Sequence, residues 1–256
     1  MAGNERLESI RMRLMTSGSV NVEELKDIYR VSLETIRRDL AKLVDEGTAI
    51  RTYGGAVINK EAHTSKIDFA VRAETHLREK QKIAAMAVDF VKPFSHIGCD
   101  ASTTALEVLR LVRDREDIVI LTNSVQALLE MMDSKCELRS TGGIVDPKAG
   151  YMMGRAAADV IRNFNLDISF LSCKGIDQSG NVFDTYESET ELKQIFMQKS
   201  RQKILLAGHS KIGRIGFTSW AKVWDFDLFI TDEMPPENLL RELRERDVSF
   251  IYKKRQ

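Results

Sequence analysis

The sequence has few cysteines and no long hydrophobic run. Its three cysteines, Cys99, Cys136 and Cys173, lie far apart, and no two of them form a CxxC pair. This spacing disfavours a zinc site or a disulfide framework, so we expect buried free thiols in a reducing, cytoplasmic environment. No apolar segment approaches the ~20 residues that cross a bilayer, and the N-terminus does not resemble a signal peptide, so no membrane partner is expected.

An excess of charge of one sign is also missing. The chain has 38 lysines and arginines against 38 aspartates and glutamates. Overall charge therefore gives no support for nucleic-acid binding, and any DNA contact would have to come from a local surface. What is present is enough material for two domains: 256 residues, 43% of them hydrophobic, allow a small domain plus a medium one.

The first sixty residues predict three short helices followed by a strand and a turn. Asn21 and Ser32 are suited to cap the second and third helices, and Gly47 is suited to end the third in a left-handed conformation. This order is typical of a winged helix-turn-helix, in which the third helix lies in the major groove of DNA. The predicted helices span residues 5–15, 22–29 and 32–46, and the predicted strand spans residues 49–53.

The outward face of the third helix and the wing supply the candidate DNA contacts. Arginine can pair with guanine edges, whereas hydroxyl and amine groups more often hold phosphates. Between Val31 and Ala56, however, acidic residues are as numerous as basic ones. From periodicity alone, a solvated helix in a small interaction bundle is as good an interpretation as DNA binding. The candidates are Ser32, Thr35, Arg37, Arg38, Lys42, Arg51, Tyr53, Gly54 and Gly55.

After a polar connector and a helix that begins near Glu74, strand-like and helical patterns alternate. Such alternation predicts an α/β domain with a mainly parallel sheet, in which ligands bind beyond the carboxyl ends of the strands. The predicted strands span residues 95–99, 118–121, 135–139, 168–171, 203–207, 228–231 and 249–252. The predicted helices between them span residues 102–111, 125–132, 156–164, 188–199 and 236–246.

Polar loops follow three of these strands in succession. Hydroxyl groups and backbone N–H groups at the start of a helix suit a phosphate, because the helix dipole also favours an anion. The alternative for each loop is a plain helix cap without a ligand. Three such loops in a row favour a shared pocket. The candidate residues in these loops are Asp100, Ser102, Thr103, Thr104, Thr122, Asn123, Gly142 and Gly143.

Charged residues farther along the chain fit the same pocket. Lys174, Lys193 and Lys211 could neutralise a phosphate, while Asp100, Asp177 and Glu189 could accept hydrogen bonds from sugar hydroxyls. Each could equally be an ordinary surface charge when taken alone. Their shared position at strand ends favours a binding site.

Two sets of motifs resemble DeoR-type transcriptional regulators. The first runs from Val31-Ser32 through Thr35-Ile36-Arg37-Arg38-Asp39-Leu40 to Arg51-Thr52-Tyr53-Gly54-Gly55-Ala56. The second includes Asp100-x-x-Thr103-Thr104, Leu121-Thr122-Asn123, Thr141-Gly142-Gly143, Gly175-Ile176-Asp177 and His209-Ser210-Lys211-x-Gly213. The resemblance implies operator contacts from Thr35, Arg37, Arg38 and the wing. It also implies a sensor domain similar in fold to ribose-5-phosphate isomerase, with a phosphorylated sugar or polyol as effector.

The sequence differs from the family pattern at two positions of the second set. Gly208 stands where family members usually have an aspartate, three residues before the lysine of the SKxG string. Ser102 stands where a glycine is often found in the first phosphate loop. We therefore expect the ligand geometry to differ from the usual one, with His209 as a neighbour that could compensate.

Together these patterns predict a DNA-binding repressor of a carbohydrate or polyol catabolic operon that a phosphorylated sugar-type effector releases from double-stranded operator DNA. We expect a winged helix-turn-helix domain over 1–57, a linker over 58–73 and an effector-sensing and oligomerisation domain over 74–256. The protein should be a homo-oligomer, dimer or tetramer, with no metal, no cofactor and no catalytic residues. The alternatives are a sugar-phosphate isomerase or aldolase, for which Asp100, Glu189 and Lys211 would be candidates, and a DNA-binding protein without a ligand.

Overall fold

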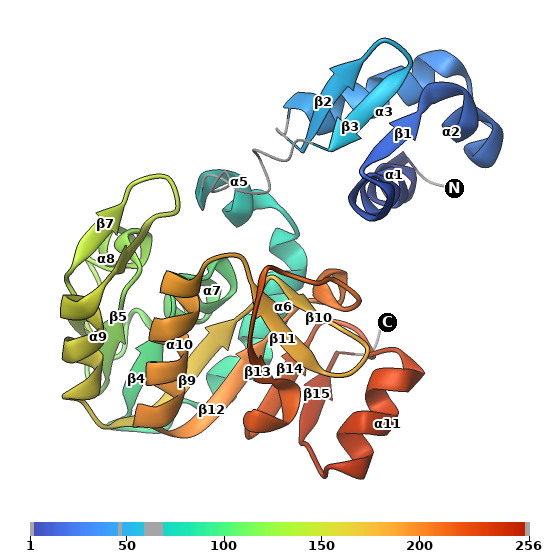
Figure 1. Cartoon of the computed structure of the whole chain (residues 1–256). Coiled ribbons are helices and arrows are strands. Elements are labelled where there is room, and N and C mark those ends of the chain that lie inside the picture. The colour runs from blue at the N-terminus through green and yellow to red at the C-terminus, as the bar shows by residue number, and fades with distance from the viewer. Residues whose placement is uncertain (1–2, 46–47, 59–68, 254–256) are drawn as a thin grey trace. The chain divides into compact units, whose positions relative to one another are not determined.

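The computed structural model describes residues 3–45, 48–58 and 69–253. Chain contacts divide the protein into two compact units, residues 1–67 and residues 68–256, and each unit is described by itself (Figure 1). The predicted end of the third helix at Gly47 lies outside the described residues, as does most of the predicted linker.

The smaller unit has the predicted order of three helices and a wing. Its three strands form an antiparallel sheet in the order β1-β3-β2. The strand β1 was not predicted, because a three-residue strand is too short to show an alternating pattern. The elements are α1 (Gly3–Ser17), β1 (Ser19–Asn21), α2 (Val22–Tyr29), α3 (Leu33–Asp45), β2 (Ala49–Thr52) and β3 (Gly55–Ile58).

Both predicted helix caps of the smaller unit are present. The side chain of Asn21 accepts a hydrogen bond from Glu23 N, and Ser32 Oγ accepts one from Thr35 N at 3.2 Å. Arg30, between α2 and α3, has a left-handed backbone with φ of 53°. This residue ends α2 and turns the chain into α3. One apolar core joins the elements and contains Ile10, Leu14, Leu25, Ile36, Leu40, Leu43, Ala49 and Ala56.

The larger unit is built on a seven-stranded sheet, and every strand pair in it is parallel. Its strand order is β15-β14-β12-β9-β4-β5-β6. All seven predicted strands are confirmed, each within a few residues of its predicted ends. The strands are β4 (His96–Cys99), β5 (Val119–Thr122), β6 (Glu137–Ser140), β9 (Leu166–Ser172), β12 (Ser200–Leu206), β14 (Leu228–Thr231) and β15 (Phe250–Tyr252).

Helices cover both faces of this sheet, as Figure 1 shows. One apolar core joins α6, α7 and α8 to one face, and a second core joins α9, α10 and α11 to the other. Burial on both faces explains why the strands appear in the sequence as nearly continuous apolar runs. The helices are α5 (Phe69–Glu74), α6 (Leu77–Ala87), α7 (Thr103–Val112), α8 (Val125–Glu130), α9 (Arg155–Arg162), α10 (Glu187–Lys199) and α11 (Glu237–Glu245).

Several short elements of the larger unit were not predicted. A hairpin follows β6, and a three-stranded antiparallel sheet lies beside α10. The strands are β7 (Ile144–Asp146), β8 (Tyr151–Met153), β10 (Gly175–Ile176), β11 (Asn181–Asp184) and β13 (Thr218–Lys222), and short 3-10 turns occur at Val88–Phe90, His209–Lys211 and Val223–Asp225.

The strand order reverses between β4 and β9. From β4 the chain proceeds outward to β5 and β6, and it then returns to β9 on the other side of β4. In such sheets a crevice forms beyond the carboxyl ends of the strands at the reversal point, and ligands bind there. A ligand site is therefore expected among the residues that follow β4 and end β9. No helix in the described ranges is long and apolar enough to span a bilayer.

Gly55 provides a test of how the wing is built. A Cβ atom at this position would lie 1.9 Å from Val20 O, because β1 and β3 pair there at close range. Replacing Gly55 with alanine should therefore destabilise the smaller unit by about 2 kcal/mol or more. Amide hydrogen exchange of the full chain should show lost protection in β1, β2 and β3, with the larger unit unchanged.

Gly54→Ala is the matched control. Its added Cβ would meet only Asn21 Nδ2, at 3.8 Å, which is an ordinary contact. Equal loss of protection in the two variants would contradict this account of the close approach.

Candidate DNA-binding and effector sites

The outward face of α3 presents three basic side chains that have no partner in the described part of the chain. Arg37, Arg38 and Lys42 are exposed and form no ion pair there. Ser32 is also exposed, and its hydroxyl bonds the half-buried Thr35 hydroxyl at 2.8 Å. These five predicted contacts therefore lie on one helix and its cap.

Burial of Asp39 changes the charge that α3 shows to solvent. Arg6 Nε lies 2.6 Å from Asp39 Oδ2, and both side chains are almost fully buried. In the sequence, Asp39 is one of the acidic residues that equal the basic ones in number between Val31 and Ala56. Because Arg6 neutralises it inside the core, the exposed surface of α3 is more basic than the sequence of the helix indicates.

The wing places Arg51 and Tyr53 in solvent. Tyr53 is fully exposed at the turn between β2 and β3, and Arg51 and Gly54 are exposed beside it. Gly55 is buried, and its packing against β1 accounts for a glycine at that position. Of the predicted wing contacts, Arg51, Tyr53 and Gly54 are therefore exposed, whereas Gly55 is not.

In the larger unit, a buried ion pair lies at the reversal point of the sheet. Lys193 Nζ of α10 lies 2.7 Å from Asp100 Oδ2, which follows β4, and 3.2 Å from Asp184 Oδ2, which ends β11. Burial works against both charges. Even so, the neighbouring carboxylates raise the pKa of Lys193, and Lys193 lowers the pKa of Asp100. Burial raises the pKa of Asp184 to about 6.

Ser172, at the end of β9, connects this ion pair to a second lysine. Its backbone N–H donates to Asp100 Oδ2 at 2.9 Å, and Lys193 Nζ donates to its carbonyl. Lys211 Nζ donates to the Ser172 hydroxyl at 2.7 Å, and that hydroxyl donates to Leu206 O. Three predicted effector residues, Asp100, Lys193 and Lys211, are thus brought together as expected.

The start of α7 offers backbone donors beside this cluster. Ser102 caps the helix by accepting a hydrogen bond from Ala105 N, and its own N–H donates to Asp100 Oδ1. The N–H groups of Thr103 and Thr104 donate to no acceptor within the described ranges. Ser102 therefore supplies the helix cap at the position where the family often has glycine.

In the other predicted loops, polar side chains form hydrogen bonds within the protein. Thr122 Oγ1 accepts from Ser124 N, and Asn123 Nδ2 donates to Met152 O. Asn123 Oδ1 is buried with no hydrogen-bond partner among the described residues. Gly142 and Gly143 have left-handed backbones, and a Cβ at Gly143 would lie 2.5 Å from Met153 O. Only the free oxygen of Asn123 offers a ligand an unused acceptor here.

Two predicted acidic residues have different surroundings. Asp177 accepts bonds from Ser179 N and from the backbone and side chain of Asn181, so it holds the turn between β10 and β11. Glu189, at the start of α10, has a buried Oε2 without a hydrogen-bond partner in the part of the chain that the structure describes. Glu189 is therefore available to a ligand, whereas the hydrogen bonds of Asp177 stabilise a turn.

Three members of the cluster were not predicted from the sequence. They are Asp184, described above, and the two cations Arg72 of α5 and Lys80 of α6, which lie near Lys174. Burial, followed by repulsion from Arg72, lowers the pKa of Lys174 to about 8. Burial, followed by repulsion from Lys211, lowers the pKa of Lys80 to about 8. Arg72 and Lys80 lie at or before the start of the sheet domain, where no motif signalled them.

Gly208 leaves room for a neighbouring carboxylate. A Cβ at this position would lie 3.3 Å from Asp232 Oδ1, which accepts a bond from His209 N at 2.7 Å. Asp232 Oδ2 pairs with His209 Nδ1 at 2.7 Å and raises the pKa of His209. An aspartate at position 208 would bring a second carboxylate against Asp232, which the glycine avoids.

One group among the described residues has the composition of a metal site. The ligand atoms of His209, Asp232 and Glu233 lie within 4.8 Å of one another. His209 Nδ1 is already paired with Asp232, however, so this arrangement is a carboxylate–imidazole pair rather than an open set of ligands.

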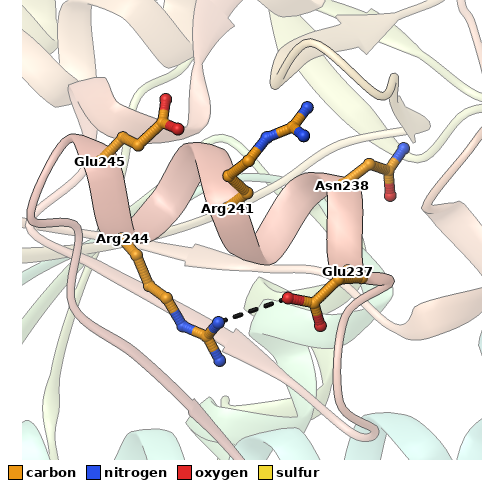
Figure 2. A pocket seen from close by; sticks show the side chains of 5 residues that line it. All are labelled: Glu237, Asn238, Arg241, Arg244 and Glu245. Carbon is orange, nitrogen blue, oxygen red and sulfur yellow. Dashed lines mark hydrogen bonds and ion pairs between the residues drawn. The ribbon is translucent and has the colours of Figure 1, made fainter.

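Figure 2 shows a surface depression beside α11 that is unrelated to this cluster. Carboxylates and guanidinium groups alternate there, and Arg244 Nη1 pairs with Glu237 Oε1 at 3.4 Å. Exposed ion pairs of this kind are screened by solvent and contribute little. The lining residues are Glu237, Asn238, Arg241, Arg244 and Glu245.

The closely spaced cations around Lys174 should lower the stability of the protein when no ligand is bound. The pKa of Lys174 in the folded state, about 8, lies below its ordinary value of 10.5, so folding is opposed below pH 8 and the cost falls as the pH rises from 8 toward 10.5. Lys174→Met should therefore raise the melting temperature at pH 7 by a few degrees, corresponding to about 1–2 kcal/mol. The gap to the wild-type protein should narrow above pH 8.

The exposed Lys82→Met on α6 is the control for the loss of a lysine charge, and its melting temperature should match the wild type. If Lys174→Met were less stable than the wild type at pH 7, repulsion at this position would be disproved.

Two family models match the chain, one in each unit. A DeoR-like helix-turn-helix domain matches residues 6–62, and a DeoR C terminal sensor domain matches residues 75–233. The uncharacterized HTH-type transcriptional regulator YulB of Bacillus subtilis is 37% identical over 229 residues, which cover 89% of this chain and 88% of that protein. The glycerol-3-phosphate regulon repressor of Escherichia coli K12 is 28% identical, covering 98% of this chain and 99% of the other.

The putative aga operon transcriptional repressor of Escherichia coli O157:H7 is 31% identical over 97% of this chain and 93% of its own length. Among solved structures, ribose 5-phosphate isomerase A of Methanocaldococcus jannaschii is similar to part of the fold, with 19% identity and a TM-score of 0.40 over 54% of this chain and 55% of that one. The sequence matches alone carry the assignment. The chain belongs to the DeoR family of transcriptional regulators and joins a DNA-binding helix-turn-helix domain to a non-catalytic sensor domain.

Proposed function

We propose that the protein represses a carbohydrate or polyol catabolic operon and that a phosphorylated sugar or polyol releases it from its operator. The observation that carries this proposal is the excess of cations at the sheet reversal point. Lys193 is neutralised by two carboxylates, whereas Lys174, Lys80 and Lys211 have no carboxylate within ion-pair distance in the described ranges. An anion supplied from outside would balance them.

The chemistry around these cations favours a phosphate that is attached to a hydroxylated carbon chain. The free N–H groups at the start of α7 and the positive end of that helix suit the phosphate. Glu189 Oε2 and Asn123 Oδ1 are buried acceptors without partners among the described residues, and they suit hydroxyl groups. The name of one relative, a glycerol-3-phosphate regulon repressor, contains a polyol phosphate and supports the same class of ligand.

Release from DNA would follow from linkage between the two units. An effector that binds one arrangement of a homo-oligomer more tightly favours that arrangement at the expense of DNA binding. Because a single smaller unit offers few basic contacts, we propose that two or more copies are needed to occupy adjacent half-sites. The competing possibility is a DNA-binding protein that needs no effector.

A thermal-shift screen tests the effector class. A ligand that binds only the folded chain raises the melting temperature, so the correct sugar or polyol phosphate should do so and its unphosphorylated form should not. Lys211→Ala should lose most of the shift. In a gel-shift titration with DNA that the wild-type chain selects from a random pool, the same ligand should weaken binding.

If no sugar or polyol phosphate changed either the melting temperature or the DNA affinity, the effector proposal would fail and a regulator without a metabolite would be favoured.

Arg38 tests the DNA-binding half of the proposal. Its exposed guanidinium has no partner in the described part of the chain and is available to a base edge. Arg38→Ala should weaken binding to selected DNA by about 1–3 kcal/mol and reduce discrimination against altered sites. The exposed Arg13→Ala of α1 is the control and should leave discrimination unchanged. An unaltered specificity ratio in Arg38→Ala would remove Arg38 from base recognition.

A further inference from the structure

The short helix α5 carries a cation into the effector cluster, although its sequence lies within the predicted linker. Arg72 Nη2 donates to Ala149 O at 2.6 Å, and its guanidinium lies 5.1 Å from the centre of the Phe69 ring. The charge of Arg72 is close enough to Lys174 to contribute to that lysine's lowered pKa. Arg72 is therefore part of the same electrostatic group as the lysines of the sheet domain.

Tertiary contacts hold α5 in this position. Its six residues are too few for a helix that is stable by itself, so its place depends on tertiary contacts. Phe69 N donates to Lys148 O at 3.3 Å, and Lys80 Nζ donates to the carbonyl groups of Arg72 and Ala73 at the end of the helix. Phe69 is buried in the main core, and Ala73 packs against it. An added contact to Arg72 would strengthen the attachment of α5.

Arg72 retains the capacity for such a contact. A guanidinium has five N–H donors, and among the described residues the side chain of Arg72 makes one hydrogen bond and no ion pair. Lys80 is nearly buried and bonds only carbonyl oxygens there, and Lys174 has no side-chain partner. A planar guanidinium beside two ammonium groups matches the oxygen atoms of a phosphate better than any neutral group.

We propose that Arg72 binds the phosphate of the effector together with Lys174, and that the bound effector thereby holds α5 against the rest of the sensor domain. This inference rests on the proposed function, and it adds a binding residue and a route for the signal. α5 begins directly after residues 59–68, which connect it to the DNA-binding unit. Effector binding therefore fixes the point at which the connecting chain leaves the sensor domain.

The test uses the full chain, with inorganic phosphate as the first probe and any sugar phosphate found by thermal shift as the second. Potassium chloride at matched ionic strength is the blank. We expect either ligand to increase amide protection of residues 69–75 in hydrogen exchange. Arg72→Gln should weaken phosphate binding about tenfold or more, because a charge-assisted hydrogen bond is lost, and should abolish the added protection. Arg78→Gln, an exposed arginine on α6, should behave as the wild type.

The DNA affinity of Arg72→Gln should no longer fall when the effector is added. If Arg72→Gln fails to fold, Arg72→Lys keeps the charge, loses the forked geometry and should show a smaller loss in phosphate affinity. Wild-type phosphate binding in a folded Arg72 variant, or unchanged exchange of residues 69–75 on binding, would overturn this inference alone. A wild-type chain that responds to neither probe would overturn the proposed function as well.

Discussion

The buried ion pair between Asp100 and Lys193 is the interaction on which the sensor domain depends. Together with Asp184 and Ser172, it joins four elements: the end of β4, the end of β9, the end of β11 and the middle of α10. Removing charges from water costs several kcal/mol per ion, and an ion pair offsets this cost only with good geometry and additional hydrogen bonds. Such a group is a poor choice for stability alone, but it fixes where the strand ends lie relative to one another.

Because the ion pair of Asp100 and Lys193 already fixes the strand ends, the remaining cations can lack counter-ions. Once Lys193 has neutralised Asp100 and Asp184, no carboxylate among the described residues lies within ion-pair distance of Lys174, Lys80 or Arg72. Burial and mutual repulsion lower the pKa values of the two lysines, so the empty site is less stable than a neutral one would be. Under the proposed function, the same cations would make the site prefer an anion over a neutral sugar.

The fold was largely predictable because its signals are local. Apolar runs at regular intervals located all seven parallel strands, and Ser102 and Ser124 begin their helices as capping rules require. The hairpins were missed because their strands contain no apolar run of four or more residues. The site was predictable where residues follow strands directly, as Asp100 does. Arg72 and Lys80 could not be found in this way, since only the packing of α5 and α6 brings them to the sheet.

In both units, the number of charged residues in the sequence conceals which cations are available for binding. The DNA-binding unit seemed neutral in sequence, but Asp39 is turned inward onto Arg6 and does not reach the surface of α3. In the sensor domain, Lys193 likewise pairs with two of the buried carboxylates, Asp100 and Asp184. In both units, pairing of acidic groups inside the fold leaves arginine and lysine side chains free at the surface or in the pocket. A protein without net charge can thus have separate surfaces that suit two anions, a polynucleotide and a small phosphate. A ligand shifts the equilibrium between two states of such a protein only by the difference in its affinity for those states.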